Sequence, residues 1–117
     1  MRFLVADDSK LARLSTIKSL TAQLPNAEIV QAQNGQEAIE AVKGHRIDVV
    51  FLDLTMPVMN GYEAIPEILA YSPSTKIIVV SADIQEKARE RVINLGAQLH
   101  VQKPIDTSKM KEILEII

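Results

Sequence analysis

The chain has 117 residues, of which 47% are hydrophobic and 24% charged, and its formal net charge is −2. This length predicts a single domain, and the composition excludes disordered, collagen-like and coiled-coil chains. The absence of cysteine excludes disulfides and thiolate zinc sites. The longest apolar runs are too short for a bilayer span or a signal peptide, so we expect a cytoplasmic protein without membrane insertion. The small net charge and 3% aromatic content predict no direct binding of nucleic acid.

The N-terminal part alternates short apolar segments with segments of helical spacing. Residues 3–6 are predicted as a buried strand, and a helix is predicted from Ser9 to about Gln23. The apolar stripe of this helix is predicted to consist of Leu11, Leu14, Ile17, Leu20 and Leu24. A second strand is predicted over 27–32, and after a turn at Asn34-Gly35 a short helix is predicted over 38–44.

The middle of the chain holds the most apolar strand. Residues 47–52 are almost all β-branched or aromatic, which predicts a central strand covered on both faces. A loop over 55–61 contains Pro57 and the turn signal Asn60-Gly61. The next helix is predicted over 62–70, and Pro66 inside it predicts a kink or a later start.

The remainder repeats the same alternation. Strands are predicted over 76–81 and 99–101, and helices over 84–95 and 105–117. Five strand–helix units predict an α/β fold with a five-stranded, doubly wound parallel sheet and helices on both faces. We expect residues 1–117 to form one domain, and the apolar helical end at Ile117 suggests that the natural chain continues as a longer protein.

Polar side chains collect where these strands end. The residues at the strand ends are Asp7 and Asp8, Asp53 followed by Thr55, Ser81 followed by Asp83, and Lys103. In a doubly wound sheet the carboxyl ends of the strands share one edge, and ligands bind there. We therefore expect three carboxylates, a hydroxyl and an ammonium at one rim.

This set of groups suits phosphoryl chemistry with a metal ion. Neighbouring carboxylates repel one another, and oxygen ligands of this kind favour Mg²⁺. A carboxylate beside Mg²⁺ can attack phosphorus and form an aspartyl phosphate. An ammonium and a hydroxyl, such as those of Lys103 and Ser81, can hold the phosphoryl oxygens.

Each group alone also has an ordinary structural interpretation. Asp7 and Asp8 can be acidic residues at a helix start, Ser81 can be a helix N-cap, and Lys103 can be a solvated surface lysine. Complementary groups at four separate strand ends are rarely a coincidence, and the joint occurrence favours the functional interpretation.

Four motifs resemble the receiver domain of two-component response regulators, and the resemblance covers essentially the whole chain. The motifs are Ala6-Asp7-Asp8-Ser9, the stretch from Leu52 to Gly61 with the pattern D-x-x-M-P-x-M-x-G, Val80-Ser81-Ala82, and Lys103-Pro104. The chain resembles single-domain chemotaxis regulators or an isolated receiver. The resemblance implies a flavodoxin-like fold with strand order 2-1-3-4-5.

The resemblance also implies the roles of individual residues. Asp53 would be the phosphoacceptor. The metal ligands for Mg²⁺ would be Asp8, Asp53 and the backbone carbonyl of Thr55, with Asp7 acting through water. Ser81 would hydrogen-bond the phosphoryl group, and Lys103, before a cis peptide bond to Pro104, would pair with it.

The implied partners are proteins. A sensor histidine kinase would be the phosphodonor, and a downstream protein or a fused effector domain would read the switch, with the receiver a monomer or a phosphorylation-dependent dimer. The domain would be a switch and not an enzyme, although it would take phosphate from small donors and lose it by itself. The readout surface would be the fourth helix, fifth strand and fifth helix. Its exposed residues would be Lys87, Arg91, Gln98, Lys109 and Lys111.

Some positions depart from the family pattern. His100 stands where the family has an aromatic switch residue on the fifth strand, so its ring is either half-exposed or alternates between inward and outward positions. Thr55 and Asp83 occupy the two variable positions that tune dephosphorylation in the family. His45 is expected to be solvated.

Two other classes remain open on the sequence. A haloacid-dehalogenase-like phosphatase would also use an aspartyl nucleophile, but it needs an acid two residues later, where this chain has Thr55. A nucleotide- or flavin-binding domain would have a glycine-rich loop after the first strand, where this chain has Asp7-Asp8-Ser9.

Overall fold

The computed structural model describes the whole chain, Met1–Ile117, as five strands alternating with five helices. The strands are β1 (Arg2–Ala6), β2 (Glu28–Ala32), β3 (Val49–Leu52), β4 (Lys76–Ser81) and β5 (Leu99–Gln102). The helices are α1 (Lys10–Gln23), α2 (Gly35–Gly44), α3 (Gly61–Tyr71), α4 (Glu86–Leu95) and α5 (Thr107–Ile116). Every predicted element is present, with ends shifted by a few residues. None of the helices is long and apolar enough to cross a membrane.

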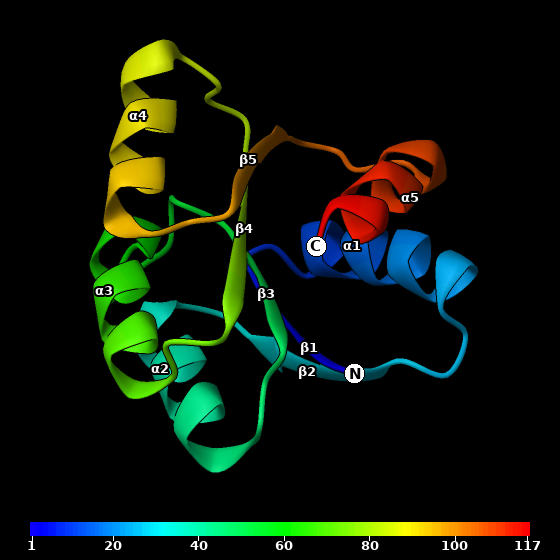
Figure 1. Cartoon of the computed structure of the whole chain (residues 1–117), viewed down its shortest axis with the longest axis horizontal. Coiled ribbons are helices and arrows are strands. Elements are labelled where there is room, and N and C mark those ends of the chain that lie inside the picture. Colours follow the sequence, from blue (N-terminus) through cyan, green and yellow to red (C-terminus); the bar gives the residue numbers. More distant parts are fainter.

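The strands form one parallel sheet in the order β2-β1-β3-β4-β5, which confirms the predicted fold and strand order. Helices α1 and α5 cover one face of the sheet, and α2, α3 and α4 cover the other (Figure 1). Because all the strands are parallel, their carboxyl ends lie at one edge, the upper edge in Figure 1.

The core lies on both faces of the sheet, and β3 contributes to each. Val50 and Leu52 belong to the cluster beneath α2, α3 and α4. Val49 and Phe51 belong to the cluster beneath α1 and α5, where the Phe51 ring stacks 6.1 Å from that of Phe3. Burial of a strand on both faces explains its uninterrupted apolar sequence.

Helix α1 differs from the predicted stripe at its N-terminal end. Leu11 is 81% exposed and Leu14 is 44% exposed, so their predicted place in the core is wrong. The buried residues of the helix are Arg13, Thr16, Ser19 and Leu20. Arg13 and Ser19 donate to the main-chain oxygens of Asp7 and Ile105, and only the second half of the helix packs on apolar core.

Helix α3 begins at Gly61, so the later start suggested by Pro66 is wrong. A capping box fixes the start: the Asn60 side chain accepts a hydrogen bond from the Glu63 N–H (2.9 Å), and Glu63 accepts one from the Asn60 N–H (3.2 Å). Pro66 lies on the exposed side of the helix, and the helix continues through it to Tyr71.

Candidate functional site

Three carboxylates gather at the upper edge of the sheet, where the neighbouring strands β1 and β3 end. One carboxylate oxygen from each of Asp7, Asp8 and Asp53 lies within 4.8 Å of the others. Asp7 and Asp53 are buried and Asp8 is exposed. The parallel register of β1 and β3 therefore brings together Asp7 and Asp53, although they lie far apart in the chain, as expected from the sequence.

The two buried carboxylates are fixed by main-chain donors. Asp7 Oδ1 accepts a hydrogen bond from the Ser9 N–H (2.9 Å), and Asp53 Oδ1 accepts one from the Leu54 N–H (2.9 Å). Both recorded contacts of the Asp53 carboxylate, from the Leu54 N–H and from Lys103, are made by Oδ1. Oδ2 of Asp53 takes part in neither of these contacts.

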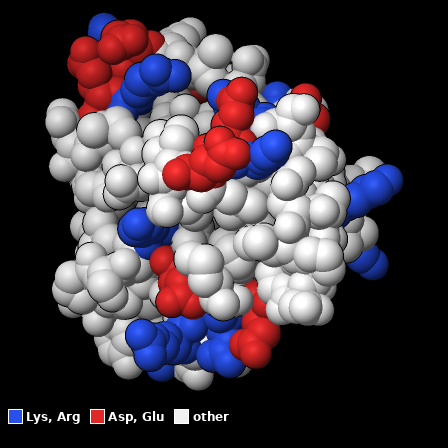
Figure 2. Space-filling view, turned by 45° about the vertical axis from the view of Figure 1, so that its right-hand side comes forward, with Lys and Arg blue, Asp and Glu red and all other residues white.

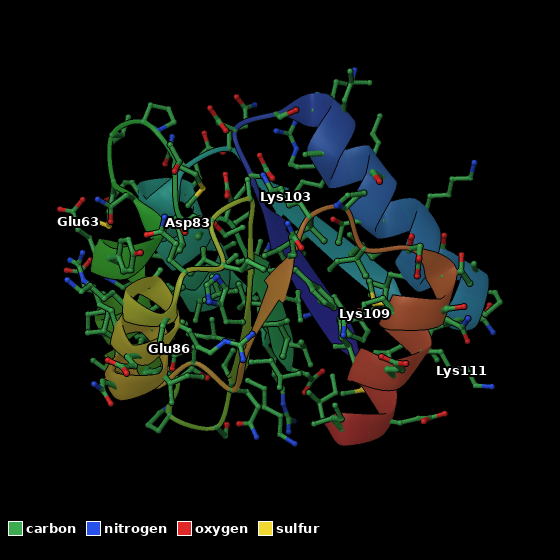
Figure 3. All side chains as sticks on the ribbon, turned by 90° about the horizontal axis from the view of Figure 1, so that it is seen from above. Glu63, Asp83, Glu86, Lys103, Lys109 and Lys111 are labelled. Atoms are coloured by element: carbon green, nitrogen blue, oxygen red, sulfur yellow. The ribbon has the colours of Figure 1, made fainter.

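Lys103 joins these two carboxylates. Its ammonium Nζ lies 2.7 Å from Asp7 Oδ2 and 3.3 Å from Asp53 Oδ1. Figure 3, which looks down on this edge, shows Lys103 over the strand ends, whereas Lys109 and Lys111 lie on α5 at the side. The interpretation of Lys103 as a solvated surface lysine is therefore wrong. The Lys103–Pro104 peptide bond is cis, as the resemblance implied.

Burial and charge shift the pKa of both partners. Burial raises the pKa of Asp53, the neighbouring Asp7 raises it further, and Lys103 only partly opposes this. Burial alone would lower the pKa of Lys103, but its hydrogen bond to Asp7 and the charge of Asp53 outweigh burial and raise it. Lys103 therefore stays charged and neutralises part of the repulsion between the carboxylates.

Ser81 is buried at the end of β4. Its hydroxyl oxygen accepts a hydrogen bond from the Asp83 N–H (3.0 Å), and Asp83 Oδ1 accepts one from the Gln85 N–H (3.0 Å). Gln85 is the N-cap of α4, so the interpretation of Ser81 as the N-cap is wrong. Ser81 instead closes a tight turn between the end of β4 and the start of α4.

Thr55 lies in the exposed loop between β3 and α3. No backbone N–H donates to its carbonyl oxygen. The loop is held at its far end, where the Gly35 N–H donates to the Met59 carbonyl (2.8 Å) and the Gly61 N–H donates to the Leu54 carbonyl (3.0 Å). The carbonyl of Thr55 is therefore available on a loop with fixed ends.

His100 is buried in β5, with 6% of its surface exposed, so the half-exposed alternative is wrong for this conformation. It pairs with Val79, on the sheet face covered by α4. Neither ring nitrogen has a hydrogen-bond partner. Burial lowers the pKa of His100, and Arg89 lowers it further while Asp83 opposes both. His45 is exposed, as predicted.

The sequence interpretation missed one residue beside the site. Arg13 is 8% exposed, and its Nη1 donates to the Asp7 carbonyl at 2.7 Å. The predicted apolar stripe included Leu11 and Leu14 and left Arg13 out of the buried face. The helical spacing of three and four residues also fits a buried face formed by Arg13, Thr16 and Leu20. That spacing was the signal in the sequence that could have identified Arg13 as buried.

Comparison with known proteins agrees with this geometry. The family model of the response regulator receiver domain matches residues 3–115. The chain is 37% identical over 113 residues to the chemotaxis protein CheY of Thermotoga maritima, a match that covers 97% of this chain and 93% of that protein. It is 38% identical over 121 residues to a protein-glutamate methylesterase/protein-glutamine glutaminase of Bacillus licheniformis, covering 97% of this chain and 34% of that protein.

Solved structures give the same result. The response regulator domain of Thermotoga maritima CheB has a TM-score of 0.84 at 30% identity, with 98% of this chain and 91% of that chain covered. A CheX-CheY-BeF3-Mg+2 complex from Borrelia burgdorferi has a TM-score of 0.87 at 28% identity, with 99% of this chain and 85% of that chain covered. On its sequence, fold and acidic cluster, the chain belongs to the response regulator receiver domain family.

Proposed function

We propose that this receiver domain accepts a phosphoryl group on Asp53 and thereby switches a protein-binding surface. The observation that carries the proposal is Lys103, whose ammonium bridges Asp7 and Asp53 while Asp8 lies beside them. An ammonium and three carboxylates at one strand edge form a site that can hold both a divalent cation and a phosphoryl group.

The donor set fits Mg²⁺, which prefers oxygen ligands. Asp8, Asp53 and the carbonyl of Thr55 would hold the ion directly, and Asp7 would hold it through water. When bound, Mg²⁺ supplies positive charge that offsets the repulsion between the carboxylates and an incoming phosphoryl group. The similar structure from Borrelia burgdorferi is a complex with BeF3 and Mg+2, which supports this assignment.

Asp53 would act as the nucleophile. One of its carboxylate oxygens attacks phosphorus and forms an acyl phosphate, and the P–N bond of a phosphohistidine on a sensor kinase breaks. The electron pair of that bond stays on the imidazole nitrogen. With acetyl phosphate the P–O bond breaks instead and acetate leaves. Loss of phosphate by hydrolysis would return Asp53 to its carboxylate.

Lys103 and Ser81 would hold the new group. Conversion of Asp53 to an acyl phosphate moves its negative charge outward onto the phosphoryl oxygens, and the Lys103 ammonium would follow that charge. Ser81 accepts a hydrogen bond from the Asp83 N–H and still has its own O–H to donate. Rotation of that O–H toward the phosphoryl group would alter the turn before α4.

The output would pass to the surface of α4, β5 and α5. Its predicted residues Lys87, Arg91, Gln98, Lys109 and Lys111 are all exposed. Figure 2 shows basic and acidic side chains intermixed on one face of the molecule, and exposed charges of both signs suit a protein partner or a fused effector domain. Binding would leave the receiver a monomer or a phosphorylation-dependent dimer.

Acetyl phosphate with Mg²⁺ tests the proposal. We expect intact-mass measurement to show one added phosphoryl group in the wild type and in an Asp48→Asn control, at the opposite end of β3, and none in Asp53→Asn. Labelling without Mg²⁺, or labelling of Asp53→Asn, would contradict the proposal. Sustained hydrolysis of an aryl phosphate ester would instead favour the phosphatase alternative.

A further inference from the structure

Arg13 is a buried cation directly behind the acidic cluster. From α1, its Nη1 donates to the Asp7 carbonyl at 2.7 Å and its Nε donates to the Gln31 side chain of β2 at 2.9 Å. The guanidinium thus ties α1 and β2 to the residue that follows β1. No buried nitrogen of Arg13 lacks a partner.

The partners of this guanidinium are neutral oxygens. The four ion pairs of the chain involve other residues, although three carboxylates lie close by in the cluster. Burying a charge is costly unless its hydrogen bonds are well placed. The guanidinium of Arg13 contacts the main-chain oxygen of Asp7 and no carboxylate. This contact therefore fixes the backbone at Asp7.

The oxygen in question belongs to the peptide unit that joins Asp7 to Asp8. The Asp7 N–H donates to the Ala32 carbonyl at 3.0 Å, so this residue is held from both sides of its main chain. With the peptide plane fixed, the Asp7 carboxylate reaches the Ser9 N–H and Lys103. The direction of the Asp8 carboxylate depends on the same plane.

We infer that Arg13 is a positioning residue that aims the paired carboxylates of Asp7 and Asp8 at a divalent cation. The inference rests on the proposed function. Groups that orient metal ligands by hydrogen bonds typically contribute about 10- to 100-fold to metal affinity. Gln31 would act one step further out, by directing the guanidinium toward Asp7.

The test is the Mg²⁺ dissociation constant of the unphosphorylated protein, followed by NMR from the amide shifts of residues 7–10. We expect Arg13→Met to weaken binding by about tenfold or more. Arg13→Lys should also weaken Mg²⁺ binding. The guanidinium is planar and holds the Asp7 carbonyl and the Gln31 side chain with two separate nitrogens, and a single ammonium cannot reproduce that geometry. Gln31→Ala should give a smaller loss, and Arg46→Met, at an exposed arginine without a recorded ion pair, should give none.

Urea unfolding without Mg²⁺ separates positioning from support of the fold. A purely structural role would lower the free energy of unfolding and leave the dissociation constant unchanged, which would overturn the inference. Tighter Mg²⁺ binding by Arg13→Met would also overturn it, because the residue would then act only through its charge. If Arg13→Met fails to fold, the Mg²⁺ dissociation constants and unfolding free energies of Arg13→Lys and Gln31→Ala distinguish the two roles by the same criteria.

Phosphorylation by acetyl phosphate gives a second measurement. In Arg13→Lys we expect the half-maximal Mg²⁺ concentration to rise while the rate at saturating Mg²⁺ recovers. An unshifted Mg²⁺ dependence in this variant contradicts the inference and leaves the proposed function intact. A wild type that neither binds Mg²⁺ nor accepts phosphate refutes the proposed function itself.

Discussion

A Cβ atom added to Gly61 would lie 2.3 Å from the carbonyl oxygen of Asp53. Helix α3 therefore begins against the backbone of the proposed phosphoacceptor, and the Gly61 N–H donates to the Leu54 carbonyl next to it. A side chain at this position has no flexible neighbour to displace, because the obstructing atoms belong to the main chain. Only glycine allows this close approach.

Gly61→Ala should destabilise the domain by about 1–3 kcal/mol, as overpacking against fixed atoms does. Urea unfolding measures the change. Gly44→Ala is the matched control, since nothing lies within 4 Å of a Cβ at Gly44. The control should leave stability unchanged or raise it by up to about 1 kcal/mol. Equal effects of the two substitutions would show that Gly61 is not constrained by Asp53.

Val58 lies in the same loop with a φ of 67°, in the left-handed region, and is 82% exposed. A β-branched residue is strained there, whereas asparagine tolerates this conformation. Val58→Asn should therefore raise the free energy of unfolding by about 1 kcal/mol. The same urea titration measures the gain. A neutral or destabilised variant would mean that the Val58 side chain makes a contribution that outweighs the strain.

The fold could be predicted because each strand–helix unit has its own pattern in the sequence: an apolar run for the strand, a helical spacing of apolar residues, and turn residues between them. The failures have local physical causes. Leu11 and Leu14 have core spacing, but α1 there covers polar strand ends, so Arg13 is buried in their place. Pro66 weakens a helix, but its effect depends on a capping box and on exposure, which follow from tertiary structure.

The sequence predicts which residues form the site and at which edge of the sheet they lie, but it does not predict which side chains contact each other. That Asp7, Asp53 and Lys103 meet follows from parallel topology. Lys103 lies nearer to Asp7 than to Asp53. This difference depends on side-chain geometry, which neighbouring residues in the sequence do not reveal. The burial of His100 likewise depends on α4 packing over β5.

Asp8 is the exposed member of the acidic cluster and takes part in no ion pair. Asp8→Ala should abolish Mg²⁺-dependent phosphorylation and leave the fold intact. Without Mg²⁺ its free energy of unfolding should equal or exceed that of the wild type, because repulsion with Asp7 and Asp53 is relieved. Intact-mass measurement after treatment with acetyl phosphate and Mg²⁺ checks the first effect, and urea unfolding measures the second. Phosphorylation at the wild-type rate would contradict the assignment of Asp8 as a ligand.

His100 should make the stability of the domain depend on pH. Burial lowers its pKa in the folded state, so the unfolded state binds the proton more tightly. The free energy of unfolding should therefore be highest above the ordinary histidine pKa of about 6.5 and fall as the pH drops through it toward the lower folded-state value. If the inward ring accompanies activation, phospho-dependent partner binding should also weaken from about pH 8 to about pH 6.

His100→Phe should remove both pH dependences, because phenylalanine keeps the buried ring and has no proton to bind. Of the other charged groups near this ring, Arg89 on α4 opposes protonation and Asp83 favours it. His45→Gln, at the exposed histidine, is the matched control and should retain the wild-type profile. Identical pH profiles in wild type and His100→Phe would show that His100 does not titrate in this range.

The site of the phosphoryl group is the most direct test of the proposed function. Borohydride reduction of the domain treated with acetyl phosphate and Mg²⁺ converts an aspartyl phosphate to homoserine, which peptide mass spectrometry locates. We expect homoserine at Asp53 alone, because both carboxylate oxygens of Asp7 are engaged, by the Ser9 N–H and by Lys103, whereas the recorded contacts of the Asp53 carboxylate involve Oδ1 alone. Modification at Asp7, Asp8 or Ser81 with Asp53 unmodified would contradict the account.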